Sequence, residues 1–367
     1  MKMDKTINAL GLMSGTSMDG IDASLIRSDG EKKLDIIGNL YLKYDLELKN
    51  ALTNFSQKIN SLDNLKDNLD EYEKLERAIT IKNSEIALKI YNEFNFKVGI
   101  VGFHGQTIIH KPKENYSIQM GNAKLLSQLL NTNVIYQFRK NDIENGGEGA
   151  PLTPIYHHLL KKKLNLRNNV LFLNIGGIAN YTFIKEDNFY AKDVGPGNCL
   201  MDTYIKKIKN LDFDKNGDAA ASGNIDKTLI NNFFEHEFYN VKKKHSLDIK
   251  DFDINFVRGL SFEDALASLN FFTAKVISEN IKSDLKDDFT IILCGGGRKN
   301  KTLVSNMKKF LNNKFYDIDE FNINGDFIES QAFAYLSIRS LYKKDISFPN
   351  TTKVKKSVSG GELIKSV

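Results

Sequence analysis

The chain has 367 residues, of which 41% are hydrophobic and 26% charged, a balance that is typical of a folded globular protein and excludes a disordered one. A chain of this length usually divides into two domains, because single hydrophobic cores stop growing before this size. The net charge of +5 suits an anionic small molecule such as a nucleotide, but the lysines alternate with acidic residues and no nucleic-acid-binding module is present.

The first hundred residues predict strands, then helix, then a further strand. Apolar runs separated by turn residues predict strands over 7–13, 21–27 and 33–42. A charged region over 46–94 follows, with apolar residues at helical spacing. A buried type of strand over 98–103 then ends in polar residues and glycine.

A similar order begins near residue 168. Strands are predicted over 170–175, 178–184 and 189–194. A helix over 262–281, a strand over 289–293 and a helix from Lys301 complete the second half. Glycines follow the last strand, as they follow its counterpart in the first half.

This repetition predicts a duplicated α/β fold. Two βββαβα units facing each other make up the actin-like, ribonuclease H-like ATPase architecture, with an active-site cleft between the domains. We expect domain I at 1–138, with 346–367 packing back on it, and domain II at 139–345. The alternative is a chance resemblance between two α/β halves.

The cysteines and the lengths of the apolar runs indicate the cellular compartment in which the protein is expected. Cys199 and Cys294 form neither a disulfide framework nor a metal-type pair, so we expect reduced, buried thiols. No apolar run reaches the roughly 18 residues of a membrane span. Residues 1–6 lack an export-type apolar stretch. We therefore expect a cytoplasmic protein with no membrane or nucleic-acid partner.

Three glycine turns are candidate phosphate sites. Gly15–Ser17 offers unhindered backbone N–H groups and two hydroxyls beside Asp19. Asn174–Gly177 mirrors it in the second half, and Gly295–Gly297 lies between a strand and a helix. A single turn of this kind usually only joins strands, but three in a duplicated frame favour a nucleotide site. The P-loop sequence is absent, which excludes that class of site.

Asp193 is the candidate general base. It ends a predicted strand, before a restricted loop at Gly195–Gly197. Lys192 points to the opposite face of that strand, which leaves Asp193 unpaired and able to accept a proton. The alternative is a turn-forming or helix-capping Asp. Asp202, early on the next helix, is explained by the helix dipole alone.

The loop at 146–151 and Glu329 are two further candidates. Three glycines and a proline make the loop either a hinge or a substrate-facing segment. Glu329 begins an apolar-faced helix, where its charge stabilises the N-terminus or its carboxylate reaches the cleft. His104 follows an apolar strand and is read as a structural histidine. The remaining histidines have no metal spacing: His110, His157, His158, His236 and His245.

Taken together, these segments resemble the anhydro-N-acetylmuramic acid kinase family along nearly the whole chain. The set in this order is highly specific, although each segment alone is common. The matching segments are Gly11–Asp22, Gly102–Thr107, Gln119–Asn122, Gly146–Leu152, Asn174–Asn180, Asp193–Asn198 with Met201 and Asp202, Cys294–Gly297, and Glu329–Ala334.

The resemblance implies an actin-like kinase that takes ATP and Mg²⁺. It implies the small-molecule substrate 1,6-anhydro-N-acetylmuramic acid, a product of cell-wall recycling, and the 6-phosphate as product. Asp193 is similar to the family's catalytic base and Glu329 to its second catalytic carboxylate. A homodimer is left open.

The resemblance also implies the binding residues. For ATP they are Gly15, Thr16, Ser17, Met18, Asp19, Gly20, Ile21, Asp22, Asn174, Gly176, Gly177, Gly195, Gly197, Asn198, Gly295, Gly296 and Gly297. For the sugar they are His104, Gln106, Arg139, Asp142, Gly147 and Glu148. For the metal we expect Asp19, with Asp22 or water left open.

Three positions depart from the family pattern. Gln137 stands where an Asp usually precedes Phe-Arg, and His245 where Lys is more often followed by Ser. Met13 occupies the position of a magnesium-binding Asp in many members of the wider superfamily. A kinase for another sugar on the same fold, or an actin-like or chaperone-type ATPase, are the alternatives.

Overall fold

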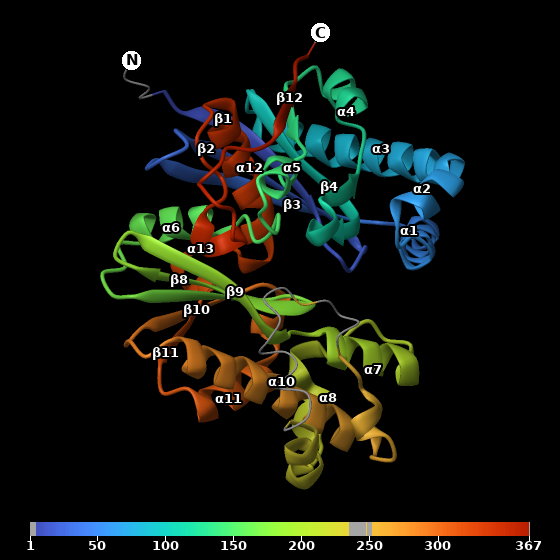
Figure 1. Ribbon diagram of the computed structural model, residues 1–367, viewed down its shortest axis with the longest axis vertical. Helices are drawn as coiled ribbons and strands as arrows, with labels where there is room; N and C mark the ends of the chain where they lie inside the picture. Colours follow the sequence, from blue (N-terminus) through green and yellow to red (C-terminus); the bar gives the residue numbers. More distant parts are fainter. Residues whose placement is uncertain (1–4, 235–246, 248–251, 367) are drawn as a thin grey trace. The chain divides into compact units, whose positions relative to one another are not determined.

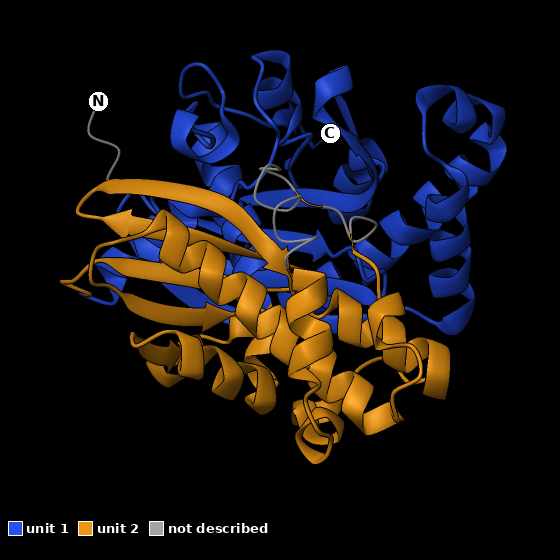
Figure 2. Cartoon of the chain, turned by 60° about the horizontal axis from the view of Figure 1, so that its bottom comes forward, with its two compact units in different colours: residues 1–165, 327–367 blue, residues 166–326 orange. Residues whose placement is uncertain are grey.

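The computed structural model describes residues 5–234, 247 and 252–366. The chain forms two compact units, Met1–Asn165 with Phe327–Val367 (unit 1) and Leu166–Asp326 (unit 2), which Figure 2 colours separately. Each unit is built around one β-sheet (Figure 1).

The unit 1 sheet has the order β3-β2-β1-β4-β6-β12, with β5 paired to β4. Strands β1 to β3 are antiparallel, and β4 and β6 run parallel to β1. The strands are β1 (Ile7–Ser14), β2 (Gly20–Ser28), β3 (Leu34–Lys43), β4 (Ile100–Lys111), β5 (Tyr116–Met120), β6 (Val134–Tyr136) and β12 (Glu362–Ile364).

Helices cover both faces of this sheet. The stripe predicted over 46–94 is confirmed, because Leu75, Ile79, Ile86 and Ile90 of α3 are buried in one core with the strands. The helices are α1 (Leu46–Lys58), α2 (Leu62–Asp67), α3 (Leu69–Phe94), α4 (Ala123–Leu130), α5 (Lys140–Glu144), α6 (Pro154–Lys163), α12 (Ile328–Leu341) and α13 (Pro349–Thr352), with the 3-10 turn η1 (Pro112–Glu114).

Helix α12 lies on the face opposite α3, and two glycines let its backbone come close. A Cβ on Gly11 of β1 would lie 1.9 Å from the Ser330 carbonyl oxygen, and one on Gly102 of β4 would lie 2.3 Å from that of Phe333. Only glycine permits such an approach. The contact fixes Glu329, in the first turn of α12, relative to β1 and β4.

The unit 2 sheet has the order β9-β8-β7-β10-β11. Helix α10 packs against β9, α7, α8 and α11 around one apolar core. The elements are β7 (Val170–Ile175), β8 (Ile178–Lys185), β9 (Asn188–Pro196), α7 (Cys199–Lys209), η2 (Lys215–Gly217), α8 (Asp218–Ser222), η4 (Asn255–Val257), α10 (Phe262–Asp284), β10 (Thr290–Cys294), η5 (Gly296–Lys299), α11 (Lys301–Phe310), β11 (Lys314–Asp317), η6 (Ile318–Phe321) and η7 (Gly325–Phe327).

The two sheets confirm the predicted duplication. In each, three antiparallel strands come first, and two later strands run parallel to the first strand, giving the orders β3-β2-β1-β4-β6 and β9-β8-β7-β10-β11; in unit 1 the antiparallel strand β5 lies between β4 and β6 in the chain. This is the ribonuclease H-like sheet of the actin-like architecture. The α/β class and the repeated βββαβα unit are therefore as expected.

The limits of the units differ from the domain limits expected from the sequence. The divisions fall after Asn165 and before Phe327, instead of at residues 138 and 345. The reason is packing in unit 1: Tyr156 of α6 donates a hydrogen bond of 2.8 Å to Gln331 of α12, and α12 lies on β1, β2 and β4. The C-terminal strand β12 pairs with β6.

Strand β4 also differs from its prediction. It continues to Lys111 instead of ending at Phe103, because Gln106–Lys111 pairs with β5. His104 and Gln106 therefore lie within a strand and not in a loop after it. Short apolar runs could not signal this hairpin, since its second strand is half-buried.

Candidate active site

The turn between β1 and β2 presents an open backbone. Thr16 and Ser17 are exposed, and a Cβ on Gly15 would meet only the Ser17 hydroxyl, at 3.8 Å. Met18 donates to the Gly15 carbonyl at 3.2 Å and has a φ of 52°. A phosphate group fits such a turn, because its backbone N–H groups and two exposed hydroxyls can donate hydrogen bonds to phosphate oxygens.

Three side chains make hydrogen bonds to this turn or to the residue before it. Gln106 Nε2 donates to the Gly15 carbonyl at 3.0 Å, and the hydroxyl of Tyr41 donates to the Asp19 carbonyl at 3.0 Å. The Tyr44 hydroxyl lies 3.1 Å from that of Ser14. Gln106 is fully buried, and its Oε1 has no hydrogen-bond partner among the described residues. An acceptor in that state calls for a ligand donor.

Asp19 is the expected metal ligand. Its Oδ1 accepts a hydrogen bond of 2.6 Å from Ser17, so the carboxylate is oriented at the turn. No cluster of three or more His, Cys, Asp or Glu with metal-site geometry occurs within the described ranges. Mg²⁺ often binds through one or two carboxylates plus phosphate oxygens and water, so Asp19 fits that pattern as one ligand.

Half-buried Arg139 and buried His104 form a pair in unit 1. Arg139 Nη2 donates to His104 Nε2 at 2.9 Å and Nη1 donates to the Gly149 carbonyl at 2.8 Å. Burial and the neighbouring guanidinium lower the pKa of His104 to about 3, so the ring is neutral. Its proton is therefore on Nδ1, which donates to the Gly105 carbonyl at 2.8 Å. His104 thus orients Arg139.

Glu329 lies near the same pair. Burial lowers the pKa of Arg139 to about 10, while the charges of Glu329 and Asp142 act in the opposite direction. The family resemblance implied a role for both Glu329 and Arg139, and in unit 1 the two residues are close enough for their charges to interact. The aromatic ring of Phe333, one turn further along α12, lies 4.5 Å from that of His104.

Asp142 supports the loop at 146–149. Its Oδ2 accepts the Gly149 N–H at 2.6 Å and its Oδ1 accepts the Thr352 hydroxyl at 2.5 Å. A Cβ on Gly147 would lie 2.2 Å from Asp142 Oδ2, so the loop requires glycine there. Asp142 and Gly147 therefore shape the loop. Glu148, half-buried, is held by Lys353 at 2.6 Å.

Three glycine segments meet in unit 2, namely 174–177, 195–198 and 295–297. Gly197 and Asn198 donate backbone hydrogen bonds of 2.9 and 2.8 Å to the β7–β8 turn. A Cβ on Gly297 would lie 2.3 Å from Ile175, so the third segment touches the same turn. The predicted ATP-binding residues of unit 2, which lie in these three segments, are thus in contact with one another. Gly296 is exposed, and a Cβ on it would have no neighbour within 4 Å in the part of the chain that the structure describes.

Arg298 fixes the third segment and was missed by the sequence reading. Its guanidinium donates to the Gly295 carbonyl at 3.0 Å and also binds three carboxylates. These belong to Asp317, Asp319 and Asp326, at 3.1, 2.8 and 2.5 Å. Burial opposes the charge, but the hydrogen bonds to these carboxylates raise the pKa of Arg298 above its usual value. Partners 19 to 28 residues away gave no local signal.

Asp193 lies near the end of β9, two residues before Gly195. The prediction that it is unpaired is wrong, because its Oδ2 accepts the Leu247 N–H at 2.9 Å from 54 residues away. A carboxylate has about four acceptor positions, so this bond leaves it able to take a proton. Lys192 points elsewhere, as predicted, and binds Asp284 at 2.9 Å.

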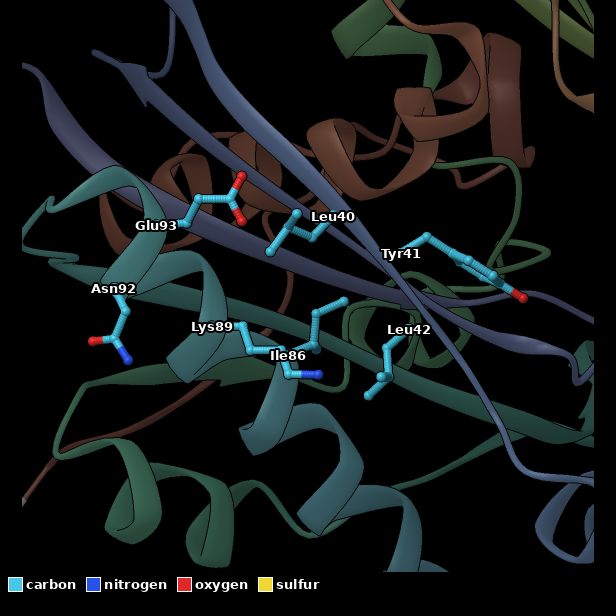
Figure 3. A pocket seen from close by; sticks show the side chains of 7 residues that line it. All are labelled: Leu40, Tyr41, Leu42, Ile86, Lys89, Asn92 and Glu93. Carbon is cyan, nitrogen blue, oxygen red and sulfur yellow. The ribbon is translucent and has the colours of Figure 1, made fainter.

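Asp202, Cys199 and Cys294 lie close in the sequence to the glycine segments of unit 2. Burial, and then the charges of Asp212 and Asp214, raise the pKa of Asp202 to about 7. Burial raises the pKa of Cys199 to about 12, and Cys294 is buried as well, so both are inert thiols as expected. Figure 3 shows a pocket of unit 1 that contains none of the predicted site residues; its lining is Leu40, Tyr41, Leu42, Ile86, Lys89, Asn92 and Glu93.

Two of the three positions that depart from the family pattern, Gln137 and Met13, lie within the described residues. Gln137 turns the chain between β6 and α5 with a φ of 55°. Met13 is buried at the end of β1. His236 and His245 lie outside the described residues. Among the helices that the structure describes, none is long and apolar enough to cross a membrane.

The family model described as anhydro-N-acetylmuramic acid kinase matches residues 7–366. The chain is 47% identical to the anhydro-N-acetylmuramic acid kinase of Pelagibacter ubique, over 99% of this chain and 100% of that protein. It is 34% identical to that of Zymomonas mobilis, over 97% of this chain and 99% of the relative.

Among solved structures, component A of (R)-2-hydroxyglutaryl-CoA dehydratase from Acidaminococcus fermentans matches with a TM-score of 0.48 and 10% identity. That match covers 92% of this chain and 100% of the other.

Proposed function

The chain belongs to the anhydro-N-acetylmuramic acid kinase family, and we propose that it opens 1,6-anhydro-N-acetylmuramic acid and phosphorylates it with ATP. It is a phosphotransferase whose substrate is a small sugar. The proposed product is N-acetylmuramic acid 6-phosphate, which places the enzyme in cell-wall recycling in the cytoplasm.

The observation that carries this proposal is the setting of Asp193. The carboxylate lies at a strand end, oriented by the Leu247 N–H, and the chain then continues directly into Gly197 and Asn198, which are bonded to the β7–β8 turn. The carboxylate of Asp193, a possible proton acceptor, is thus close in the chain to the glycine segments that contact one another in unit 2. General-base catalysis needs a positioned acceptor of this kind.

In the proposed reaction, Asp193 takes a proton from a water molecule as the water oxygen bonds to the anomeric carbon. The bond between that carbon and O6 breaks. O6 then bonds to the γ-phosphorus, and the bond between that phosphorus and ADP breaks. ATP supplies the phosphoryl group and so takes the part that a protonating carboxylic acid plays in an inverting glycosidase. One base therefore suffices.

The turn of Gly15–Ser17 would bind phosphate oxygens through its N–H groups and hydroxyls. Its open surface and the buried supports Gln106 and Tyr41 favour this role. The glycines of unit 2 would bind the rest of the nucleotide. Asp19 would hold Mg²⁺, which offsets charge on the transferred phosphoryl group.

Arg139 and Glu148 would bind the sugar. Arg139 is oriented by His104 and Gly149, which leaves further N–H donors of the guanidinium for a ligand. Glu329, beside Arg139, is the second carboxylate assigned to the sugar. Gln106 would accept a hydrogen bond from a ligand through its buried Oε1.

A comparison of two sugars tests the proposal. We expect the enzyme to form ADP with 1,6-anhydro-N-acetylmuramic acid and at least about tenfold more slowly with N-acetylmuramic acid, because the opened sugar lacks the bond between the anomeric carbon and O6 that breaks in the proposed reaction. Equal rates would identify a simple sugar kinase, in which Asp193 deprotonates a substrate hydroxyl.

A further inference from the structure

The C-terminal segment around α13 contacts the loop at 146–149. The carbonyl of Thr352 accepts the Glu148 N–H at 2.6 Å, and the Thr352 hydroxyl donates to Asp142 at 2.5 Å. Lys353 then binds the Glu148 carboxylate at 2.6 Å. Two consecutive residues therefore make three polar contacts with this loop and its supporting carboxylate.

These contacts begin a continuous hydrogen-bond chain. Thr352 donates to Asp142 Oδ1, and Asp142 Oδ2 accepts the Gly149 N–H at 2.6 Å. The Gly149 carbonyl accepts Arg139 Nη1 at 2.8 Å, and Arg139 Nη2 donates to His104 at 2.9 Å. Each member orients the next, so a change at Thr352 is transmitted to the guanidinium.

The chain is buried at its start. Thr352 is fully buried and Asp142 is 1% exposed, so water cannot replace a lost donor freely. The two Asp142 oxygens are held from opposite partners, one in the C-terminal segment and one in the loop. Without the Thr352 hydroxyl, the carboxylate is free to rotate away from Gly149.

We propose that Thr352 and Lys353 are positioning residues for the sugar-binding loop, setting the orientation of Arg139 and of Glu148 respectively. This inference rests on the proposed function, because it assigns the loop to the sugar. It predicts that the C-terminal segment governs sugar affinity and leaves nucleotide affinity unchanged.

Steady-state kinetics of Thr352→Val test it, because valine keeps the shape and removes the donor. We expect the KM for the anhydro sugar to rise about 5- to 20-fold, less than for a direct hydrogen bond to a charged group, because Thr352 acts on Arg139 only through Asp142 and Gly149. The KM for ATP should stay within about twofold. Thr352→Ser should restore the wild-type value. Lys353→Met, at a more exposed position, should raise the sugar KM by a smaller factor and tests the same loop should the valine variant not fold.

Thr351→Val is the matched control. The Thr351 hydroxyl donates to the Phe348 carbonyl at 3.0 Å and accepts the Phe348 N–H at 3.3 Å. Both bonds stay within the C-terminal segment, so the sugar KM of Thr351→Val should not change. A merely structural role for Thr352 would lower thermal stability and leave both KM values unchanged. Unchanged sugar KM in folded Thr352→Val and Lys353→Met would overturn the inference.

Amide hydrogen exchange separates this inference from the proposed function. Residues 147–149 should exchange faster in Thr352→Val than in Thr351→Val, whichever sugar the enzyme uses. Equal exchange would overturn the positioning role. A wild-type enzyme that ignores the anhydro sugar, with faster exchange in Thr352→Val, would contradict the proposed function and support the positioning of the loop.

Discussion

At the scale of single residues, Asp193 and His104 have hydrogen-bond partners that their neighbours in the sequence did not indicate. The sequence marked Asp193 by its place before a glycine loop, and the structure adds the Leu247 N–H that orients it. For His104, the sequence alone predicted a structural role and the family resemblance implied sugar binding; in the structure its ring is neutral and orients Arg139. The residues Thr352 and Lys353 gave no sequence signal, because their partners lie 210 and 205 residues away.

Replacing Asp193 by Asn removes the proton acceptor and keeps the shape. A positioned general base contributes roughly 10²- to 10⁴-fold, so turnover should fall by at least that factor. Sugar opening and ADP formation should fail together, because the two steps are coupled, and titration calorimetry should show unchanged ATP affinity. Retention of more than about a tenth of wild-type turnover would mean that another residue, with Glu329 the next candidate, is the base.

His104 makes stability depend on pH. Its pKa is about 3 in the folded protein and 6.5 in the reference state, so the unfolded chain binds more protons between these values. Stability should therefore be complete above about pH 6.5 and be lost as the pH falls toward 3. Thermal unfolding of His104→Asn, which keeps a donor and an acceptor, should depend less steeply on pH in this window. Identical pH profiles of variant and wild type would show that His104 is not buried in its neutral form.

At the scale of elements, long periodic segments could be predicted and short ones could not. The stripe of α3, the apolar runs of β1, β2 and β7, and helix α10 follow from local spacing. The strands β5, β6 and β12 have three to five residues and are defined by their pairing with β4 and with each other. The same holds for the candidate site. Its glycine turns could be predicted from the sequence, whereas the side chains that make hydrogen bonds to them, such as Tyr41 and Arg298, could not.

The β1–β2 turn is tested by Gly15→Val. The fold has room for the side chain, since a Cβ meets only the Ser17 hydroxyl at 3.8 Å, but the valine would block close approach of a phosphate group. We expect weaker ATP binding by at least about tenfold with an unchanged melting temperature. Calorimetry that finds wild-type ATP affinity in the folded variant would remove this turn from the nucleotide site.

The β10–η5 segment is tested by Arg298→Lys. Lysine keeps the charge but cannot reach Gly295 and three carboxylates at once. We expect a lower melting temperature and ATP affinity reduced about tenfold, because the Gly295–Gly297 backbone loses its anchor. Lys299→Met is the control, since it removes only an exposed ion pair with the same Asp326. Equal ATP affinity in both variants would limit Arg298 to stabilising the fold.

At the scale of the whole molecule, the proposed site residues are divided between the two units. The Gly15 turn, Arg139 and Glu329 belong to unit 1, and Asp193 with the second glycine group belongs to unit 2. The duplicated sheets could be predicted from the repeated strand pattern. The cleft expected between the domains stays a prediction, as do the bound metal and the homodimer.

The most direct measurement follows ADP and sugar phosphate together. Purified enzyme is incubated with ATP, Mg²⁺ and 1,6-anhydro-N-acetylmuramic acid, and ADP is measured by a coupled assay while the sugar is analysed by mass spectrometry. We predict one N-acetylmuramic acid 6-phosphate for each ADP, and no ADP above background when the sugar is omitted. ADP formation that does not respond to the sugar, or sugar opened without gaining phosphate, would contradict the account.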